Sequence, residues 1–267
     1  MTCTHTIKKV IAMAIKHHVL TGQQFGSQAQ AYLTSQVHSA GADLVRLGEW
    51  LAEKNQASVL DLGCGAGHAS FVAAEKVAQV TAYDLSEQML AVVSEAARAR
   101  GLGNIQVSQG MAEVLPFSDG CFDVVISRYS AHHWHDVGKA MREVKRVLKP
   151  GGMFIMMDIV SPGSPLLDTW LQTIEILRDP SHVRNYSQSE WMQFASESGL
   201  MTKHLVCDRL PLEFTTWIAR MKTPPVLSDA IRAMQVTAPE EVRQHFAFQD
   251  DGSFTSDTIM FMAQTSA

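Results

Sequence analysis

The sequence lacks the features of disulfide-stabilised, zinc-binding and membrane-spanning proteins. Its four cysteines are scattered and form no C-x-x-C pair, so neither a disulfide framework nor a zinc site is indicated. The first residues include a short apolar run, but Lys16, His17 and His18 interrupt it before a signal sequence or a spanning helix develops. We therefore expect reduced thiols, no export, no membrane insertion and a cytoplasmic protein.

A surplus of positive charge is also missing. The formal net charge is −5 at pH 7, which argues against a nucleic-acid binder with a broad basic surface. Hydrophobic residues form 46% of the chain and charged residues 18%, which is ample apolar material for a globular core. The sequence also lacks internal repeats and low-complexity tracts. We expect a partner that is a small molecule; no pattern indicates an oligomeric state.

A glycine-rich turn lies between an apolar stretch and a helix expected to begin near His68. Glycine adopts positive φ and lets the backbone approach a ligand closely, while the helix start offers free N–H groups. The spacing is D-x-G-x-G-x-G over residues 61–67, and His68 stands where a dinucleotide fingerprint has its third glycine. The residues expected to cradle a cofactor here are Asp61, Gly63, Cys64, Gly65 and Gly67.

A second acid supports this cofactor site. Residues 79–85 are predicted to form the next strand, ending in Asp84 at about twenty residues after the first glycine, the usual offset of a carboxylate that holds a ribose. The alternative is that Asp84 only caps the helix that opens at Ser86. The D-x-G-x-G-x-G pattern resembles motif I of class I S-adenosylmethionine (SAM) methyltransferases.

Further patterns resemble UbiE-like proteins, the ubiquinone/menaquinone C-methyltransferase-like family. Phe25, Ala29 and Tyr32 match its F-x-x-x-A-x-x-Y opening. The runs A-E-x-L-P-F and F-D-x-V-x-S follow within 112–127, and V-x-R-V-L-K-P-G-G, a helix stop and tight turn, spans 144–152. The stretch S-R-Y-S-A-H-H-W-H is similar to the YafE branch. The resemblance covers residues 25–160.

The resemblance implies SAM as the cofactor and extends its site. Met111, Ala112 and Glu113 would border the adenine, and Met111 stands where the family often has an aspartate. Tyr32 would face the reaction centre from a lid; the alternative is that it packs the helix onto the sheet. The remaining residues expected at the cofactor are Leu85, Met89 and Arg128.

We predict an α/β fold with a Rossmann-like sheet of the class I methyltransferase type, mostly parallel, with helices on both faces and a helical lid and insertion. The resemblance implies an antiparallel last strand between the fifth and sixth. One domain is expected at 25–267, after an N-terminal extension at 1–24. Its parts are lid helices (25–54), a cofactor-binding core (55–160), substrate-shaping helices and an insertion (161–250), and the last strand (251–267).

The loop after the fourth predicted strand, 128–135, is the candidate reaction centre because polar and aromatic residues crowd it. His132 or His133 would act as the base or orient the acceptor, since imidazole titrates near neutral pH. The alternative is that both cap and pack the next helix. No metal site is predicted, because adjacent histidines on one loop rarely face one ion.

Residues outside this core are expected to shape substrate choice. An arginine there could clamp a carboxylate, phosphate or phenolate, and Arg184 is the candidate. The alternative is that this arginine is simply solvated. The expected substrate wall comprises His182, Arg184, Tyr186, Trp217 and Arg220.

The predicted function is transfer of a methyl group from SAM to a small-molecule acceptor, at a carbon or oxygen nucleophile of quinone or phenol type. Two alternatives stay open. One is a non-catalytic protein that senses SAM or serves as an accessory subunit. The other is a nicotinamide-dependent oxidoreductase, which His68 and the missing third glycine disfavour.

Overall fold

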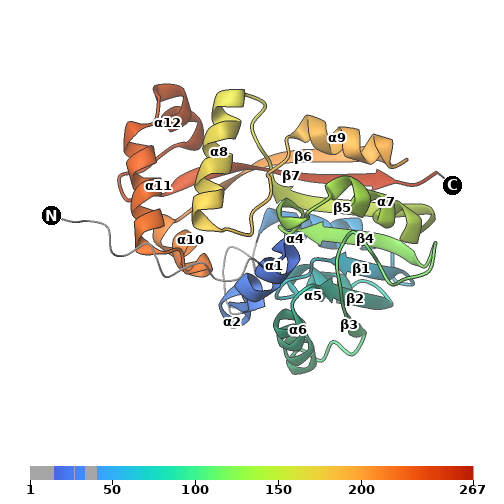
Figure 1. The fold of residues 1–267 in the computed structure, drawn as a ribbon. Helices are drawn as coiled ribbons and strands as arrows, with labels where there is room; N and C mark the ends of the chain where they lie inside the picture. The colour runs from blue at the N-terminus through green and yellow to red at the C-terminus, as the bar shows by residue number, and fades with distance from the viewer. Residues whose placement is uncertain (1–14, 27, 34–40, 267) are drawn as a thin grey trace.

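The computed structural model describes residues 15–26, 28–33 and 41–266. Within them, seven strands form one sheet with helices on both faces (Figure 1). The strands are β1 (Ser58–Leu62), β2 (Gln79–Asp84), β3 (Ile105–Gln109), β4 (Phe122–Arg128), β5 (Leu148–Ile159), β6 (Met201–Leu212) and β7 (Phe254–Gln264). The helices are α1 (His17–Gly26), α2 (Ala29–Leu33), α4 (Ala42–Trp50), α5 (His68–Ala74), α6 (Glu87–Ala99), the 3₁₀ turn η1 (Ala131–His133), α7 (Val137–Val147), α8 (Pro165–Arg178), α9 (Gln188–Glu197), α10 (Phe214–Met221), α11 (Pro225–Thr237) and α12 (Glu240–Phe246).

The strand order is β3-β2-β1-β4-β5-β7-β6. Neighbours from β3 to β5 pair in parallel, and β7 pairs antiparallel with both β5 and β6. This confirms the predicted fold class, including an antiparallel last strand between the fifth and sixth. Because β1 reverses the direction in which the chain winds, the carboxyl ends of β1 and β4 flank a crevice of the kind that binds ligands in open α/β sheets.

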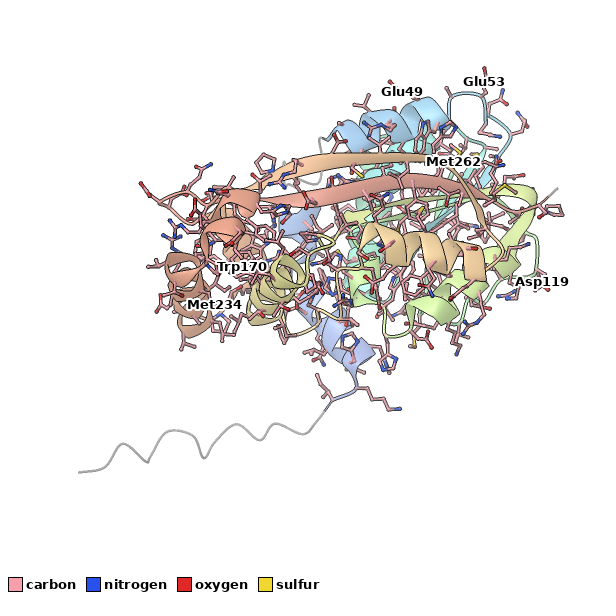
Figure 2. The ribbon with its side chains drawn as sticks, turned by 90° about the horizontal axis from the view of Figure 1, so that it is seen from above. Glu49, Glu53, Asp119, Trp170, Met234 and Met262 are labelled. Atoms are coloured by element: carbon pink, nitrogen blue, oxygen red, sulfur yellow. The ribbon has the colours of Figure 1, made fainter. Side chains whose placement is uncertain are left out.

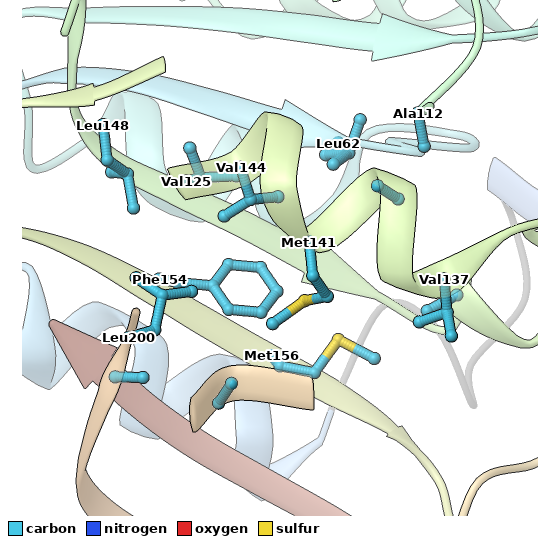
Figure 3. Close-up of a cluster of buried hydrophobic side chains, with 14 of the residues drawn as sticks. Leu62, Ala112, Val125, Val137, Met141, Val144, Leu148, Phe154, Met156 and Leu200 are labelled. Carbon is cyan, nitrogen blue, oxygen red and sulfur yellow. The ribbon is translucent and has the colours of Figure 1, made fainter. Parts of the chain in front are cut away.

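Alternate strand residues face opposite sides of the sheet and build two cores. Val59 of β1 packs with α4 and α5, whereas Leu60 packs with α7 and α9. Figure 3 shows the second core, where Met141 of α7 lies over Phe154 and Met156 of β5. These three side chains are fully buried, and each contributes about 1.5–3 kcal/mol relative to an exposed position.

A further apolar cluster lies beyond the carboxyl ends of the parallel strands. Helices α8, α10, α11 and α12 gather there (Figure 1), and Trp170 and Met234 mark this end of the molecule in Figure 2, opposite Asp119. Trp170 and Trp217 pack against Phe254 at the start of β7. The predicted helical insertion therefore forms its own small core and walls one side of the crevice.

The structure describes part of the predicted extension and starts β5 earlier than expected. Helix α1 begins at His17, so the described chain is already helical within the predicted extension; residues 1–14 and 34–40 of the predicted extension and lid lie outside the described residues. The K-P-G-G run also lies inside β5, where we expected a turn before the strand. Leu148 already pairs with Phe122 and the next pair is Met153 with Val124, so the residues between Leu148 and Met153 form a bulge within the strand. None of the helices within the described ranges has both the length and the apolar character needed to cross a membrane.

Candidate functional site

A pocket opens at the carboxyl ends of β1, β2 and β4, between the start of α5 and the helices α1 and α2. Predicted site residues that line it are Tyr32, Asp61, Gly63, Cys64, Gly65, Asp84, Leu85, Met89, Met111, Ala112, Glu113, Arg128 and His133. The structure therefore brings together residues that are spread over a hundred positions of sequence.

The three glycines of the turn have different surroundings. All have positive φ, +72° at Gly63, +51° at Gly65 and +87° at Gly67. A Cβ on Gly63 would lie 1.8 Å from Oγ of Ser130, whereas a Cβ on Gly65 would meet nothing within 4 Å. Gly65 therefore exposes its backbone to the pocket, and Gly63 lets the loop after β4 approach.

Gly67 does not line the pocket, although we expected it in the cradle. A Cβ there would lie 2.9 Å from both Phe71 of α5 and Val93 of α6. Its physical role is to let the start of α5 pack closely against α6. This differs from the third glycine of a dinucleotide fingerprint, which allows close packing of the helix on the strand.

Asp84 is held at the end of β2 by two backbone donors. The N–H of Gly65 donates to Oδ2 at 2.9 Å, and the N–H of Ser86 donates to Oδ1 at 2.8 Å. Burial raises the pKa of Asp84, while these hydrogen bonds act to lower it. The N-cap of α6 is Ser86, whose Oγ accepts from the N–H of Met89, so Asp84 is not the helix cap. Each carboxylate oxygen keeps accepting capacity toward the pocket.

Asp61 is a nearly inaccessible carboxylate, 1% exposed, at the floor of the pocket. Oγ of Ser70 donates to its Oδ2 at 2.6 Å, and its Oδ1 has no hydrogen-bond partner among the described residues. Burial raises the pKa of Asp61 to about 7. A carboxylate in this position favours a ligand that brings an N–H donor or a positive charge.

The residues expected at the adenine also hold the pocket together. The Tyr83 hydroxyl donates to the carbonyl oxygen of Met111 at 3.2 Å. Oε1 of Glu113 accepts from the N–H of Asp136 at 3.2 Å, which ties this loop to the start of α7. Met111 stands where the family often has an aspartate, so this position has no carboxylate that could accept from an adenine amino group.

The loop after β4 begins with a strained backbone. Tyr129 has φ +50°, although it is not glycine, and its N–H donates to the carbonyl of Met157. The Arg128 guanidinium lies 4.6 Å from the Tyr129 ring centroid, and its Nη2 is 3.2 Å from Asp43 of α4. Strain of this kind is concentrated at functional loops. Arg128 lines the pocket as predicted, and its guanidinium forms an ion pair with Asp43.

The two adjacent histidines have opposite surroundings. Nδ1 of His133 donates to the carbonyl oxygen of Ser181 at 3.0 Å, which leaves Nε2 as the acceptor in the neutral ring. Burial, aided by the neighbouring His132, lowers the pKa of His133 well below its usual value. Burial also lowers the pKa of His132, but Asp158, 2.7 Å from its Nδ1, reverses the shift and raises the pKa overall.

Two hydrogen bonds of Tyr32 hold helix α2 against the pocket. Nε2 of His68 donates to the backbone carbonyl of Tyr32 at 3.0 Å, and the Tyr32 hydroxyl donates to Sδ of Met221 at 3.1 Å. Phe25 lies edge-on to His133, with ring centroids 4.7 Å apart. Tyr32 thus packs and also lines the pocket, so the two interpretations of this residue are compatible.

The predicted substrate wall is only partly assembled. Trp217 and Arg220 line a second pocket, which shares Phe25, Tyr32, Tyr129 and His133 with the first. Arg184, the expected clamp, instead pairs with Asp168 and Glu190 at 2.9 and 3.5 Å, outside both pockets. His182 contacts Gln172 through Nε2, and Tyr186 packs on Trp191, so neither lines either pocket.

Several pocket residues were missed by the sequence reasoning. In the first pocket they belong to α1, a short helix whose sequence has no clear apolar pattern and so gave no signal. In the second they are charged residues at the end of α8, where the otherwise apolar run I-E-I-L-R-D was a usable signal. The missed residues are His17, His18, Thr21 and Gly22 in the first pocket, and Glu175, Arg178, Asp179 and the uncharged Asn185 of the following loop in the second. Over the described ranges, no group of three or more His, Cys, Asp or Glu side chains is arranged to hold a metal ion.

The fold is that of Rossmann-like methyltransferases of known structure. The YcgJ structure from Bacillus subtilis superposes with a TM-score of 0.80 at 35% identity, covering 84% of this chain and 98% of that one. The BH2331 structure from Bacillus halodurans C-125 gives a TM-score of 0.82 at 30% identity, covering 85% and 100%.

Sequence comparison leads to the same class. A methyltransferase domain model matches residues 60–156. YafE of Escherichia coli K12 is 58% identical over 205 residues, which cover 77% of this chain and 99% of YafE. A demethylmenaquinone methyltransferase of Lactococcus lactis is 30% identical over 147 residues, covering 52% and 58%. The chain belongs to the methyltransferase family, and the predicted UbiE-like resemblance is confirmed.

Proposed function

We propose that the protein transfers a methyl group from SAM to a small-molecule acceptor. The observation that carries the proposal is the Asp84 carboxylate, which the exposed backbone of Gly65 orients at the crevice of the sheet. A carboxylate offers acceptors and no donors, which suits the two hydroxyls of a ribose. The family membership of the chain supports the same chemistry.

The residues of the first pocket fit the separate parts of SAM. Asp84 would hold the ribose, and the backbone around Met111 and Ala112 would border the adenine. The unpartnered oxygen of Asp61 suits the α-ammonium of the methionyl part. SAM supplies the activated methyl carbon when it is bound. The protein must then align the acceptor and exclude water.

The acceptor side is formed by the four residues common to both pockets. Phe25, Tyr32 and Tyr129 are apolar in body and keep water away, while Nε2 of His133 is the acceptor that would take a proton from the nucleophile. His132 lies beside His133, with ring centroids 4.2 Å apart, and its pair with Asp158 anchors η1 at the end of β5. We propose a carbon or oxygen nucleophile of phenol or quinol type as the acceptor.

The experiment is to incubate the protein with methyl-labelled SAM and a panel of phenols and quinols, and to count label in the organic products. His133→Gln should lower turnover and leave SAM affinity unchanged, whereas Asp84→Ala should weaken SAM binding itself. Tight SAM binding without any labelled product would favour the sensor or accessory alternative. Equal turnover in His133→Gln would dismiss His133 as the base.

A further inference from the structure

The second pocket contains a buried arginine with no counter-ion. Arg220 of α10 is only 8% exposed, and no hydrogen bond or ion pair joins it to another described residue. Burial, with repulsion from Arg178, lowers its pKa. Taking a guanidinium out of water without a partner is unfavourable, and buried cations are normally paired. No carboxylate of the described residues pairs directly with this guanidinium, so a bound anion would supply its missing partner.

Arg178, the neighbouring arginine, has partners for its charge within the protein. Nη1 of Arg178 lies 3.3 Å from Glu175, its Nε donates to the carbonyl of Trp217 at 3.0 Å, and its guanidinium stacks over the Trp217 ring. The charges of Arg178 and Glu175 thus offset each other. Arg220 is therefore the arginine of this pocket whose guanidinium has no ion-pair partner among the described residues, and Asp179 is a second charged group with an unpartnered atom.

Two further buried groups leave polar atoms unpartnered in the same pocket. Asn185 is 1% exposed, with its backbone held at both ends by Gln172, and its Nδ2 has no partner among the described residues. Oδ1 of Asp179 accepts from the N–H and Oγ of Ser181, but its Oδ2 is likewise unpartnered. The pocket therefore presents two unused donors and one unused acceptor.

Apolar side chains lie between the polar groups of the second pocket, and the unpartnered oxygen of Asp179 lies near His133. Ile159, Leu212 and Trp217 line the pocket between the polar groups. Oδ2 of Asp179 lies 3.9 Å from Nε2 of His133, one of the residues shared with the first pocket. The unpartnered oxygen of Asp179, which can accept a hydrogen bond, therefore lies where the two pockets meet. Arg220 gives the same pocket a cation that can bind an anion.

We infer that the second pocket binds the methyl acceptor, and that this acceptor is a small aromatic or apolar molecule bearing a carboxylate. Arg220 and Asn185 would donate to the carboxylate, while a hydroxyl of the acceptor would face Asp179 and His133. A monoanion matches the single unpaired cation better than a phosphate dianion does, because Asp179 repels a second negative charge. The inference rests on the proposed function, and names the substrate class for it.

The binding test uses matched pairs of probes on the complex with S-adenosylhomocysteine (SAH). Benzoate, phenylacetate and 3-phenylpropionate are compared with their neutral amides by thermal shift and by calorimetric titration. At least one acid should bind about tenfold more tightly than its amide, a difference typical of one charge-assisted hydrogen bond. Arg220→Met should abolish the preference, Arg220→Lys should restore part of it, and Arg142→Gln, an exposed control, should leave it unchanged.

A stability measurement keeps the test independent of probe choice. An arginine that is buried only to meet a ligand destabilises the free protein, so Arg220→Met should raise the melting temperature of the ligand-free form by about 2–4 °C. A lower melting temperature would show that Arg220 has a structural partner and would overturn the inference. Equal binding of acids and amides, or of acids to Arg220→Met, would overturn it as well.

SAH binding separates this inference from the proposed function. If the wild-type protein and Arg220→Met both bind SAH and neither prefers acids, only the acceptor assignment fails. If the wild-type protein does not bind SAH, the proposed function fails first. The design therefore attributes a negative result to one of the two claims.

Discussion

The backbone N–H of Gly65 donates to Oδ2 of Asp84 across 2.9 Å, and this bond joins the turn after β1 to the end of β2. The two residues lie 19 positions apart in sequence, and both line the same pocket. The carboxylate is thus oriented before any ligand arrives. Such preorganisation reduces the free energy spent on ordering a site during binding.

Asp84→Asn tests this relationship. The amide keeps the size of the side chain but replaces one acceptor by a donor, so the dissociation constant for SAH should rise by about 10–100-fold. Calorimetric titration measures it. Asp119→Asn is the matched control, because Asp119 is 83% exposed at the far end of the molecule (Figure 2). An unchanged affinity in Asp84→Asn would refute the ribose assignment.

Asp61 predicts a pH dependence of binding. Its folded-state pKa is raised to about 7 by burial, above the value in an unfolded chain. Its contribution to the stability of the free protein is therefore complete below about pH 4, and is lost as the pH rises toward about 7. An ammonium ligand needs the ionised form, so SAH affinity should fall by up to about tenfold per pH unit below about pH 7. Titrations across this range should show the slope in the wild type and a flat profile in Asp61→Asn; equal slopes would contradict the assignment.

The histidine pair predicts two distinct protonation states. His133 should remain neutral, with its proton on Nδ1, across the neutral pH range, because burial lowers its pKa well below the ordinary value. His132 should become protonated at a higher pH than a free imidazole, because of Asp158. Ring nitrogen chemical shifts measure both states, with His133→Gln to assign the signals and Asp158→Asn to remove the shift in His132. Titration of His133 near its unperturbed value would show that the ring is accessible to water.

Two glycines of the turn should separate binding from stability. Gly65→Ala places a methyl group in open space at the pocket, so SAH affinity should fall while folding is weakened only by the positive φ, at about 1–2 kcal/mol. Gly67→Ala adds a clash with Phe71 and Val93, which costs about 1–3 kcal/mol more. Gly101→Ala measures the φ effect alone, since its Cβ would meet nothing within 4 Å. Thermal unfolding and SAH titration of the three variants check this; equal unfolding temperatures for Gly67→Ala and Gly101→Ala would exclude the packing role.

The fold could be predicted because its signals are local in sequence. The strand of Val59 and Leu60, the turn that follows and the acid after β2 have fixed spacings in this kind of sheet. The place of β7 between β5 and β6 was not contained in its own alternating pattern. It followed from the family resemblance, because an alternating pattern indicates a strand but not which strands lie beside it.

The acceptor side could not be predicted in the same way. Arg184 and Arg220 look alike in sequence, but Asp168 and Glu190 neutralise the first, and the helices around α10 bury the second. Which of the two adjacent histidines is neutral depends on Ser181 and Asp158, which come from a later loop and from β5. Burial and partners of this kind arise from tertiary packing, and no spacing rule encodes them.

The central claim, a SAM site in the first pocket, is tested most directly by parallel calorimetric titration of the purified protein with SAM, SAH and NADH. We expect binding of SAM and SAH and none of NADH, with both affinities weakened by about 10–100-fold in Asp84→Asn. Binding of NADH alone would contradict the assignment of the turn at residues 61–67, and with it the proposed methyl transfer.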